Sequence, residues 1–293
     1  MIAIFAKSLP ENFIEKLKEI LFRLIDAKIP FALYTTVHEI LAKNGFHHCY
    51  ASFKDDTDLP KETELFLSIG GDGTILEAVT IVKDSRIPLL GINTGRLGFL
   101  ADISFEEIQH TLDSLIYKKY DLQSRSLLEI TSNDIIIPTY NFAFNDFTLQ
   151  KNSKATLVRI KVLVNNRYLN TYWADGIIIS TATGSTAYSL SVGGPILLPE
   201  SKNLILSPIA SHNLSVRPLV IENNSVVELS IEGRFESCIA SFDGRIIEVP
   251  SQTTFIVNQA KFPVIMAQLP DNDFFTTLRN KLMWGVDKRN NDL

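Results

Sequence analysis

The feature that most constrains the fold is a change in the spacing of apolar residues near residue 120. Before that point, short apolar runs alternate with segments whose apolar residues recur every three or four positions. That rhythm of strand and helix is typical of a parallel sheet covered by helices. Residues 1–120 are therefore predicted to form an α/β domain.

Residues 8–27 give the clearest helical pattern, because apolar side chains from Phe13 to Leu24 fall on one helix face. Ser8, Pro10 and Glu11 form a capping-box pattern that predicts where this helix begins. The other elements expected in this domain are strands at 1–6, 30–34, 64–70 and 87–93 and helices at 37–45, 75–82 and 104–120.

After residue 120 the chain consists of short strand-like runs separated by turn residues. This texture predicts an all-β domain, a sandwich or a barrel, over residues 121–269. A last amphipathic segment, within residues 270–293, is predicted to be a helix that packs back on the first domain. The expected turns are Asn165-Asn166, Asn223-Asn224 and Asp243-Gly244.

Composition narrows the class of protein. The chain has 293 residues, a net charge of −5 and two widely separated cysteines, Cys49 and Cys238. The negative charge argues against non-specific binding of nucleic acid, which depends on basic patches. Isolated cysteines suit a reducing compartment, and no apolar run approaches the length of a membrane span. The expected location is the cytoplasm, with no membrane partner.

The sequence FLSIGGDGTILE, residues 66–77, places a carboxylate between glycines where a strand meets a helix. Glycines there let the backbone approach a phosphate, and the free N–H groups of the following helix favour an anion. A phosphate loop usually adds a lysine, whereas this one offers Asp72. Asp72 could hold Mg²⁺, or bind or deprotonate a ribose hydroxyl. Alternatively, it only caps a tight turn.

A second stretch rich in glycine and hydroxyl groups, WADGIIISTATGSTAYSLSVGGPIL, begins at Trp173. Its backbone N–H groups and side-chain oxygens could enclose a polar ligand. Tyr188 could add a ring or a hydroxyl, and Asp175 is another carboxylate beside a glycine. The alternative is a pair of strand-end turns with Tyr188 in the core.

Two further candidates remain open at this level. Asn145 and Asp146 interrupt an apolar run and need partners, which a ligand or a bulge could supply. Arg96 could meet a phosphate or be an ordinary surface charge.

Taken together, these motifs resemble those of the NAD kinase family. The similar segments are Gly70–Thr74, residues 91–102, Asn145-Asp146, the glycine-rich run from Asp175, SHNLSVRPLVI and SFDGR. The glycine-boxed aspartate alone also occurs in lipid kinases and, in a close variant, in phosphofructokinases. The block GSTAYSLSVGGP is more specific, and the resemblance covers essentially the whole chain.

The resemblance implies a Rossmann-like parallel sheet followed by an all-β domain. It implies transfer of the terminal phosphoryl group of ATP to the 2′-hydroxyl of the adenosine ribose of NAD⁺. Asp72 would be the base or positioning group, and a divalent cation, expected to be Mg²⁺, would bridge the nucleotide phosphates. It also implies a homodimer or homotetramer with a site shared across subunits.

The resemblance implies binding roles for several residues, and Gly71 and Gly73 would face phosphate. Asn145 and Asp146 would lie on the ribose and adenine side of NAD, and Asp175 near the nicotinamide, across a subunit contact. The adenine and ribose pocket would be lined within the segment Thr186, Ala187, Tyr188, Ser189, Leu190 and Ser191.

The chain departs from the family pattern at four positions. Asp146 stands for the usual Glu, Ala182 and Ser211 stand for Pro, and Arg245 stands for a frequent Gln. Arg245 is therefore an open candidate as an NAD contact, although a cation there could suit a phosphate.

Two other functions compete with this one. A diacylglycerol-type lipid kinase would share the aspartate box, but NTGRLGFLA replaces the Gly-Thr-Gly-Asn-Asp-type stretch expected there. A non-catalytic NAD(P) sensor of the same fold is the second, and the intact Asp72 argues against it. The phosphoryl donor, ATP or polyphosphate, and the use of NADH stay open.

Overall fold

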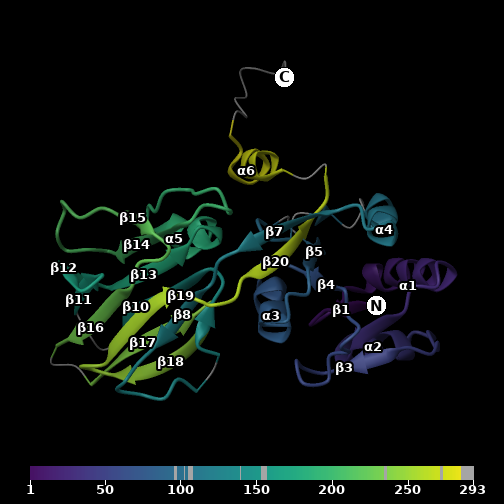
Figure 1. Ribbon diagram of the computed structural model, residues 1–293, viewed down its shortest axis with the longest axis horizontal. Coiled ribbons are helices and arrows are strands. Elements are labelled where there is room, and N and C mark those ends of the chain that lie inside the picture. Colours follow the sequence, from purple (N-terminus) through teal and green to yellow (C-terminus); the bar gives the residue numbers. More distant parts are fainter. Residues whose placement is uncertain are drawn as a thin grey trace. The chain divides into compact units, whose positions relative to one another are not determined.

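A computed structural model describes residues 1–95, 98–101, 103–104, 108–138, 140–152, 157–233, 236–270 and 273–284 (Figure 1). Contacts divide the chain into two compact units, Met1–Gln123 with Val264–Leu293, and Ser124–Pro263. The predicted limits, 1–120 and 121–269, differ from this division mainly where the chain returns to the first unit, at Val264. There the strand β20 (Val264–Gln268) joins the sheet of the first unit.

The described strands of the first unit form an eight-stranded sheet in the order β3-β2-β1-β4-β5-β20-β7, with β6 beside β5. The registered pairs from β3 through β20 run parallel, and so does the pair of β5 with β6. This order is Rossmann-like, which confirms the Rossmann-like parallel sheet that the resemblance implies. The strands are β1 Ile2–Phe5, β2 Phe31–Tyr34, β3 Ala51–Phe53, β4 Leu65–Gly70, β5 Leu89–Asn93, β6 Ile103–Ser104 and β7 Asp121–Arg125.

The helices of this unit follow the predicted apolar pattern. They are α1 Glu11–Asp26, α2 Thr35–Lys43, α3 Asp72–Val82, α4 Ile108–Ile116 and α6 Phe274–Leu282. The predicted capping box at Ser8 is wrong, because Pro10 precedes the first turn of α1 and no side chain caps it. Asp273 does cap α6, accepting hydrogen bonds from the backbone N–H groups of Phe275 and Thr276.

Alternation along the strands divides the core of the first unit between two faces of the sheet. Ile2 and Ile4 of β1 join a cluster with the apolar faces of α1, α2 and α4. Successive strand residues point to opposite faces, so Phe5 of β1 lies on the other face of the sheet, where its ring is 5.9 Å from that of Phe66 in β4. A Cβ at Gly91 would lie 2.3 Å from Ile75 Cδ1, so α3 packs closely on β5. The α6 residue Phe274 packs on this unit too, 6.5 Å from the Phe99 ring.

The second unit consists of two antiparallel six-stranded sheets in its described part, with orders β15-β14-β13-β10-β17-β18 and β12-β11-β16-β19-β8-β9. One apolar cluster joins residues of both sheets, as in a sandwich. The strands are β8 Leu128–Thr131, β9 Phe142–Ala143, β10 Asp146–Lys151, β11 Val158–Val164, β12 Arg167–Ala174, β13 Gly176–Thr181, β14 Asn203–Ile209, β15 Leu219–Glu222, β16 Val227–Glu232, β17 Ser237–Phe242, β18 Arg245–Pro250 and β19 Thr254–Gln259.

Two of the predicted turns close hairpins of this unit. Asn165 and Asn166, between β11 and β12, both have positive φ angles of 50° and 61°. Asp243 and Gly244, between β17 and β18, have φ angles of 50° and 82°. Positive φ at both central residues is the geometry of a tight hairpin turn, which Asn and Gly tolerate best. None of the described helices has the length and apolar character that crossing a bilayer requires.

Candidate functional site

The glycine-boxed aspartate lies where the strand order of the first unit reverses. β1 and β4 are neighbours, β1 leads outward to β2, and β4 leads to β5 on the other side. Ligands of open parallel sheets bind beyond the carboxyl ends of strands at this switch point. Gly70 ends β4 with a φ of 155°, and a Cβ there would stand 2.2 Å from Thr74 Oγ1. Gly70 therefore permits the close turn from β4 into α3.

Asp72 is the first residue of α3, and its carboxylate binds a second loop of the same unit. Oδ2 accepts a hydrogen bond from the Phe99 N–H at 3.0 Å, and Oδ1 accepts two, from Leu100 and Ala101, both at 3.1 Å. Gly98 makes this approach possible, because a Cβ there would lie 1.7 Å from Oδ1. The structure thus joins two motifs that the sequence showed only as separate segments.

The carboxylate of Asp72 retains acceptor capacity despite these three bonds. An ionised carboxylate has about four lone-pair positions, so one more donor, such as a hydroxyl group, fits its chemistry. The predicted alternative, in which Asp72 only caps its own turn, does not describe this geometry, since its bonds go to residues 99–101. Arg96, the other candidate in this loop, lies outside the described residues.

In the second unit, the Asn145–Asp146 turn is held by a buried carboxylate that the sequence reasoning did not single out. Asp243 accepts hydrogen bonds from the N–H groups of Phe144, Asn145 and Asp146, at 2.6, 2.8 and 3.0 Å. Burial raises the pKa of Asp243, while the three N–H donors oppose the shift. The only advance signal was the motif SFDGR, in which an aspartate precedes a turn glycine.

Asp146 is itself buried, and its charge is unfavourable there. Burial first, and the neighbouring Asp243 carboxylate second, raise the pKa of Asp146 to about 7. The Thr148 hydroxyl, which donates to Asp146 Oδ1 at 3.2 Å, opposes the shift. A carboxyl group whose pKa is raised this far is a common mark of a functional site.

The glycine-rich segment packs on the same turn. After β13 the chain forms a short 3-10 helix η2 (Thr183–Thr186) and the single-turn helix α5 (Tyr188–Ser191). Thr181 binds the turn twice, donating from N to Asn145 O at 2.9 Å and from Oγ1 to Phe144 O at 2.7 Å. A Cβ at Gly184 would lie 2.1 Å from Asn145 O. The fold thus places η2 directly against Asn145.

The predicted ligand residues of this segment fall into two environments. Ser189 is fully buried and shares a hydrogen bond of 2.9 Å with the Ser207 hydroxyl, so its hydroxyl already has a partner within the unit. Tyr188 is 41% exposed, which rules out the alternative that it is a core residue. Thr186 ends η2, Ala187 joins η2 to α5, and Leu190 and Ser191 lie in α5.

The buried polar atoms of this unit that have no hydrogen-bond partner within the described part of the chain include Asn145 Oδ1 and Thr183 Oγ1. These residues are 9% and 5% exposed. Because the backbones of Asn145 and Gly184 touch, these two polar groups belong to one region. Unpartnered buried polar groups are unfavourable, so they point to a ligand that would satisfy them. The sequence reasoning missed Thr183, whose lack of a partner appears only in three dimensions.

Asp175 and Arg245 already have partners in the protein. Asp175 Oδ1 lies 2.7 Å from Lys151 Nζ, and this pair is partly exposed. The Arg245 guanidinium donates to the backbone carbonyls of Phe242 at 3.0 Å, Tyr140 at 3.2 Å and Phe142. Arg245 therefore ties β18 to residues 140–142, whatever else it contacts.

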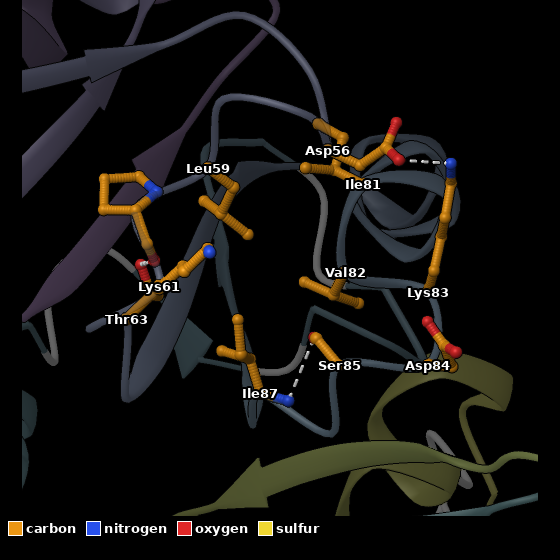
Figure 2. Close-up of a pocket in the computed structure, with 11 residues that line it drawn as sticks. Asp56, Leu59, Lys61, Thr63, Ile81, Val82, Lys83, Asp84, Ser85 and Ile87 are labelled. Atoms are coloured by element: carbon orange, nitrogen blue, oxygen red, sulfur yellow. Dashed lines mark hydrogen bonds and ion pairs between the residues drawn. The ribbon is translucent and has the colours of Figure 1, made fainter.

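A separate cavity of about 370 Å³ lies in the first unit (Figure 2). It is lined by Asp56, residues 59–61, Thr63, residues 81–85 and Ile87. The Lys83 ammonium at its wall pairs with Asp56 at 2.5 Å. Its residues lead into the amino ends of β4 and β5, whereas Asp72 follows the carboxyl end of β4. This cavity is therefore distinct from the switch-point site.

Comparison with known proteins agrees with the sequence motifs. Residues 3–120 match the family model described as the ATP-NAD kinase N-terminal domain, and residues 144–268 match the C-terminal domain. The chain is 44% identical to the NAD kinase of Flavobacterium psychrophilum over 253 residues, 86% of each chain. It is 38% identical to the NAD kinase of Cytophaga hutchinsonii over 290 residues, 98% of this chain and 99% of the other.

Solved structures show the same fold. Yeast NADH kinase complexed with NADH aligns with a TM-score of 0.85 at 22% identity, covering 98% of this chain and 88% of that one. An NAD kinase from Archaeoglobus fulgidus in complex with ATP aligns with a TM-score of 0.75 at 23% identity, covering 96% and 98%. With both domain models matched and relatives near 40% identity along nearly the whole length, the chain belongs to the ATP-NAD kinase family.

Proposed function

We propose that this protein is an NAD kinase that transfers the terminal phosphoryl group of ATP to the 2′-hydroxyl of the adenosine ribose of NAD⁺, giving NADP⁺ and ADP. The observation that carries the proposal is the fixed carboxylate of Asp72 at the switch point of the parallel sheet. The names of the relatives, and the NADH and ATP in the two solved structures, support these substrates.

Asp72 acts on the attacking hydroxyl. Its three N–H donors fix the carboxylate, leaving acceptor capacity for the ribose hydroxyl. A ribose hydroxyl is a very weak acid, so the carboxylate takes its proton late, as the new P–O bond forms. Positioning accounts for most of the acceleration. A Cβ added at Gly71 or Gly73 would meet no atom within 4 Å, so the loop leaves room for phosphate.

The second unit holds NAD⁺ through the turn and the glycine-rich segment. Asn145 Oδ1 and Thr183 Oγ1 would gain partners from the nucleotide, and Asp146 would accept a hydrogen bond from a ribose hydroxyl. Tyr188 offers an exposed ring for stacking. Asp175 would meet the nicotinamide end in exchange for part of its pairing with Lys151. Arg245 would act through the backbone carbonyls that it binds. Its guanidinium has five N–H donors, so it could also donate to a phosphate.

A divalent cation, Mg²⁺, accompanies ATP in this proposal. Kinases bind Mg²⁺ through one or two carboxylates and the substrate's own phosphates, so a single carboxylate such as that of Asp72 suits this ion. Asp72 would be the carboxylate near it, and the ion would neutralise charge on the phosphates. We also propose a homodimer or homotetramer with a shared site, and the cytoplasmic location stays a prediction.

A coupled assay tests the proposal. Purified protein is mixed with NAD⁺, MgCl₂ and ATP, and NADP⁺ is detected with an NADP-specific dehydrogenase. The expected signal disappears with EDTA. A signal with polyphosphate but not with ATP would identify polyphosphate as the phosphoryl donor and leave the rest of the proposal unchanged. Activity on diacylglycerol without activity on NAD⁺ would instead identify a lipid kinase. NAD⁺ binding without turnover on any donor would identify a sensor.

A further inference from the structure

Asp243 lies in the β17–β18 turn and its side chain is only 4% exposed. Its carboxylate receives three successive backbone N–H groups, from residues 144, 145 and 146, and its own N–H donates to Asp146 O at 3.1 Å. Each hydrogen bond to a charged acceptor is about twice as strong as a neutral one. The carboxylate therefore defines the conformation of this turn.

The opposite side of the turn is fixed as well. Asn145 O accepts from Thr181 N at 2.9 Å, and the backbone of Gly184 closes on the same residue. While the main chain of Asn145 is saturated, its side-chain Oδ1 is buried without a partner. An unsatisfied buried oxygen is unfavourable by about 1–3 kcal/mol. The turn thus holds a buried oxygen that the described residues around it do not satisfy, as expected of a preorganised ligand site.

We propose that Asp243 is a positioning residue for NAD⁺, which fixes the backbone of the Asn145–Asp146 turn and places a second buried carboxyl group beside Asp146. This inference deepens the proposed function and rests on it, because it assigns the turn to NAD⁺.

Several neighbouring groups act on the charge of Asp146. Burial and the Asp243 carboxylate raise the pKa of Asp146, and the Thr148 hydroxyl opposes them. In the described part of the chain, Arg245 is the cation beside this pair, with Nη2 at 4.0 Å from Asp243 Oδ2. A ribose hydroxyl donates to the ionised form of Asp146. NAD⁺ binding is therefore expected to strengthen as pH rises through about 7.

The test measures NAD⁺ binding by calorimetry on the full chain without ATP, from pH 5.5 to pH 8.5. Asp243→Asn keeps the size of the side chain but removes one acceptor oxygen and the charge. NAD⁺ is expected to bind about tenfold more weakly, and the midpoint of the pH dependence is expected to move to lower pH. Thr148→Val removes the opposing hydrogen bond and should move the midpoint to higher pH with little change in affinity at pH 8.5.

Opposite shifts in these two variants support the proposal, because a purely structural aspartate would lower the melting temperature without moving a binding midpoint. An unchanged midpoint in folded Asp243→Asn overturns it. If Asp243→Asn does not fold, Asp243→Glu and Thr148→Val decide: the first retains the charge and should keep the wild-type midpoint, and the second should raise it. Wild-type protein that binds no NAD⁺ at any pH refutes the proposed function itself, whereas binding without turnover leaves this inference testable.

Discussion

The backbone of Gly98 lies directly against the carboxylate of Asp72, since a Cβ at position 98 would stand 1.7 Å from Oδ1. Gly98→Ala is therefore expected to displace either the carboxylate or the 98–101 loop. A shift of about 1 Å in a positioned group can reduce turnover about 100-fold. Steady-state kinetics with NAD⁺ and ATP would measure this loss. Gly95→Ala, in the same segment and with open space at Cβ, is the matched control and should lose far less.

Asp72→Asn tests the chemical role of the carboxylate. The amide keeps one oxygen acceptor for the loop but cannot take a proton, so kcat should fall by about 10²–10⁴ while NAD⁺ affinity changes little. Near-wild-type kcat in a folded Asp72→Asn protein would contradict the assigned role. Circular dichroism and NAD⁺ calorimetry on the same preparation separate a chemical defect from misfolding.

Thr183→Val separates stability from function. The Thr183 hydroxyl is buried without a partner in the described structure, so an isosteric apolar side chain should raise the free energy of unfolding by about 1 kcal/mol. NAD⁺ should bind more weakly, because the ligand loses its own partner. Thermal melts and NAD⁺ titrations would test the two effects. Lower stability together with unchanged affinity would show that Thr183 does not face the nucleotide.

The raised pKa of Asp146 predicts how stability depends on pH. In the unfolded chain this carboxyl group titrates near 3.8, and in the folded protein near 7. Between these values the folded state holds a proton that the unfolded state has released, so this group's contribution to stability falls as pH rises through that range. Asp146→Asn should reduce the loss of stability between pH 5 and pH 8. Urea unfolding of both proteins at the two pH values would measure it, and an equal loss in both would contradict the prediction.

Arg245→Lys tests whether Arg245 acts by holding the backbone or by contacting a phosphate directly. A lysine cannot reproduce the planar fork that donates to the carbonyls of Phe242, Tyr140 and Phe142. The variant is expected to lose about 1–3 kcal/mol of stability, with the KM for ATP unchanged. A large rise in that KM at full stability would instead indicate direct contact with a phosphate.

Local patterns predicted much of the architecture because each depends on a few neighbouring residues. The apolar face of α1 and the tight turns at Asn165 and Asp243 could be read directly from spacing and turn chemistry. The start of α1 could not: Ser8 has the right spacing for a cap, yet the chain enters the helix at Pro10. Whether a side chain caps a helix depends on the path of the preceding backbone, which spacing does not specify.

The α/β and all-β classes, the family, and Asp72, Asn145 and Asp146 as candidates follow from the linear chain, because periodicity and motif order are properties of the sequence. The folded structure was needed to show that Asp72 binds residues 99–101 and that Asp243 holds the Asn145–Asp146 turn from nearly 100 residues away. It also shows that β20 joins the first sheet. Hydrogen bonds between distant segments, and the burial that shifts the pKa of Asp146, exist only once the chain has folded.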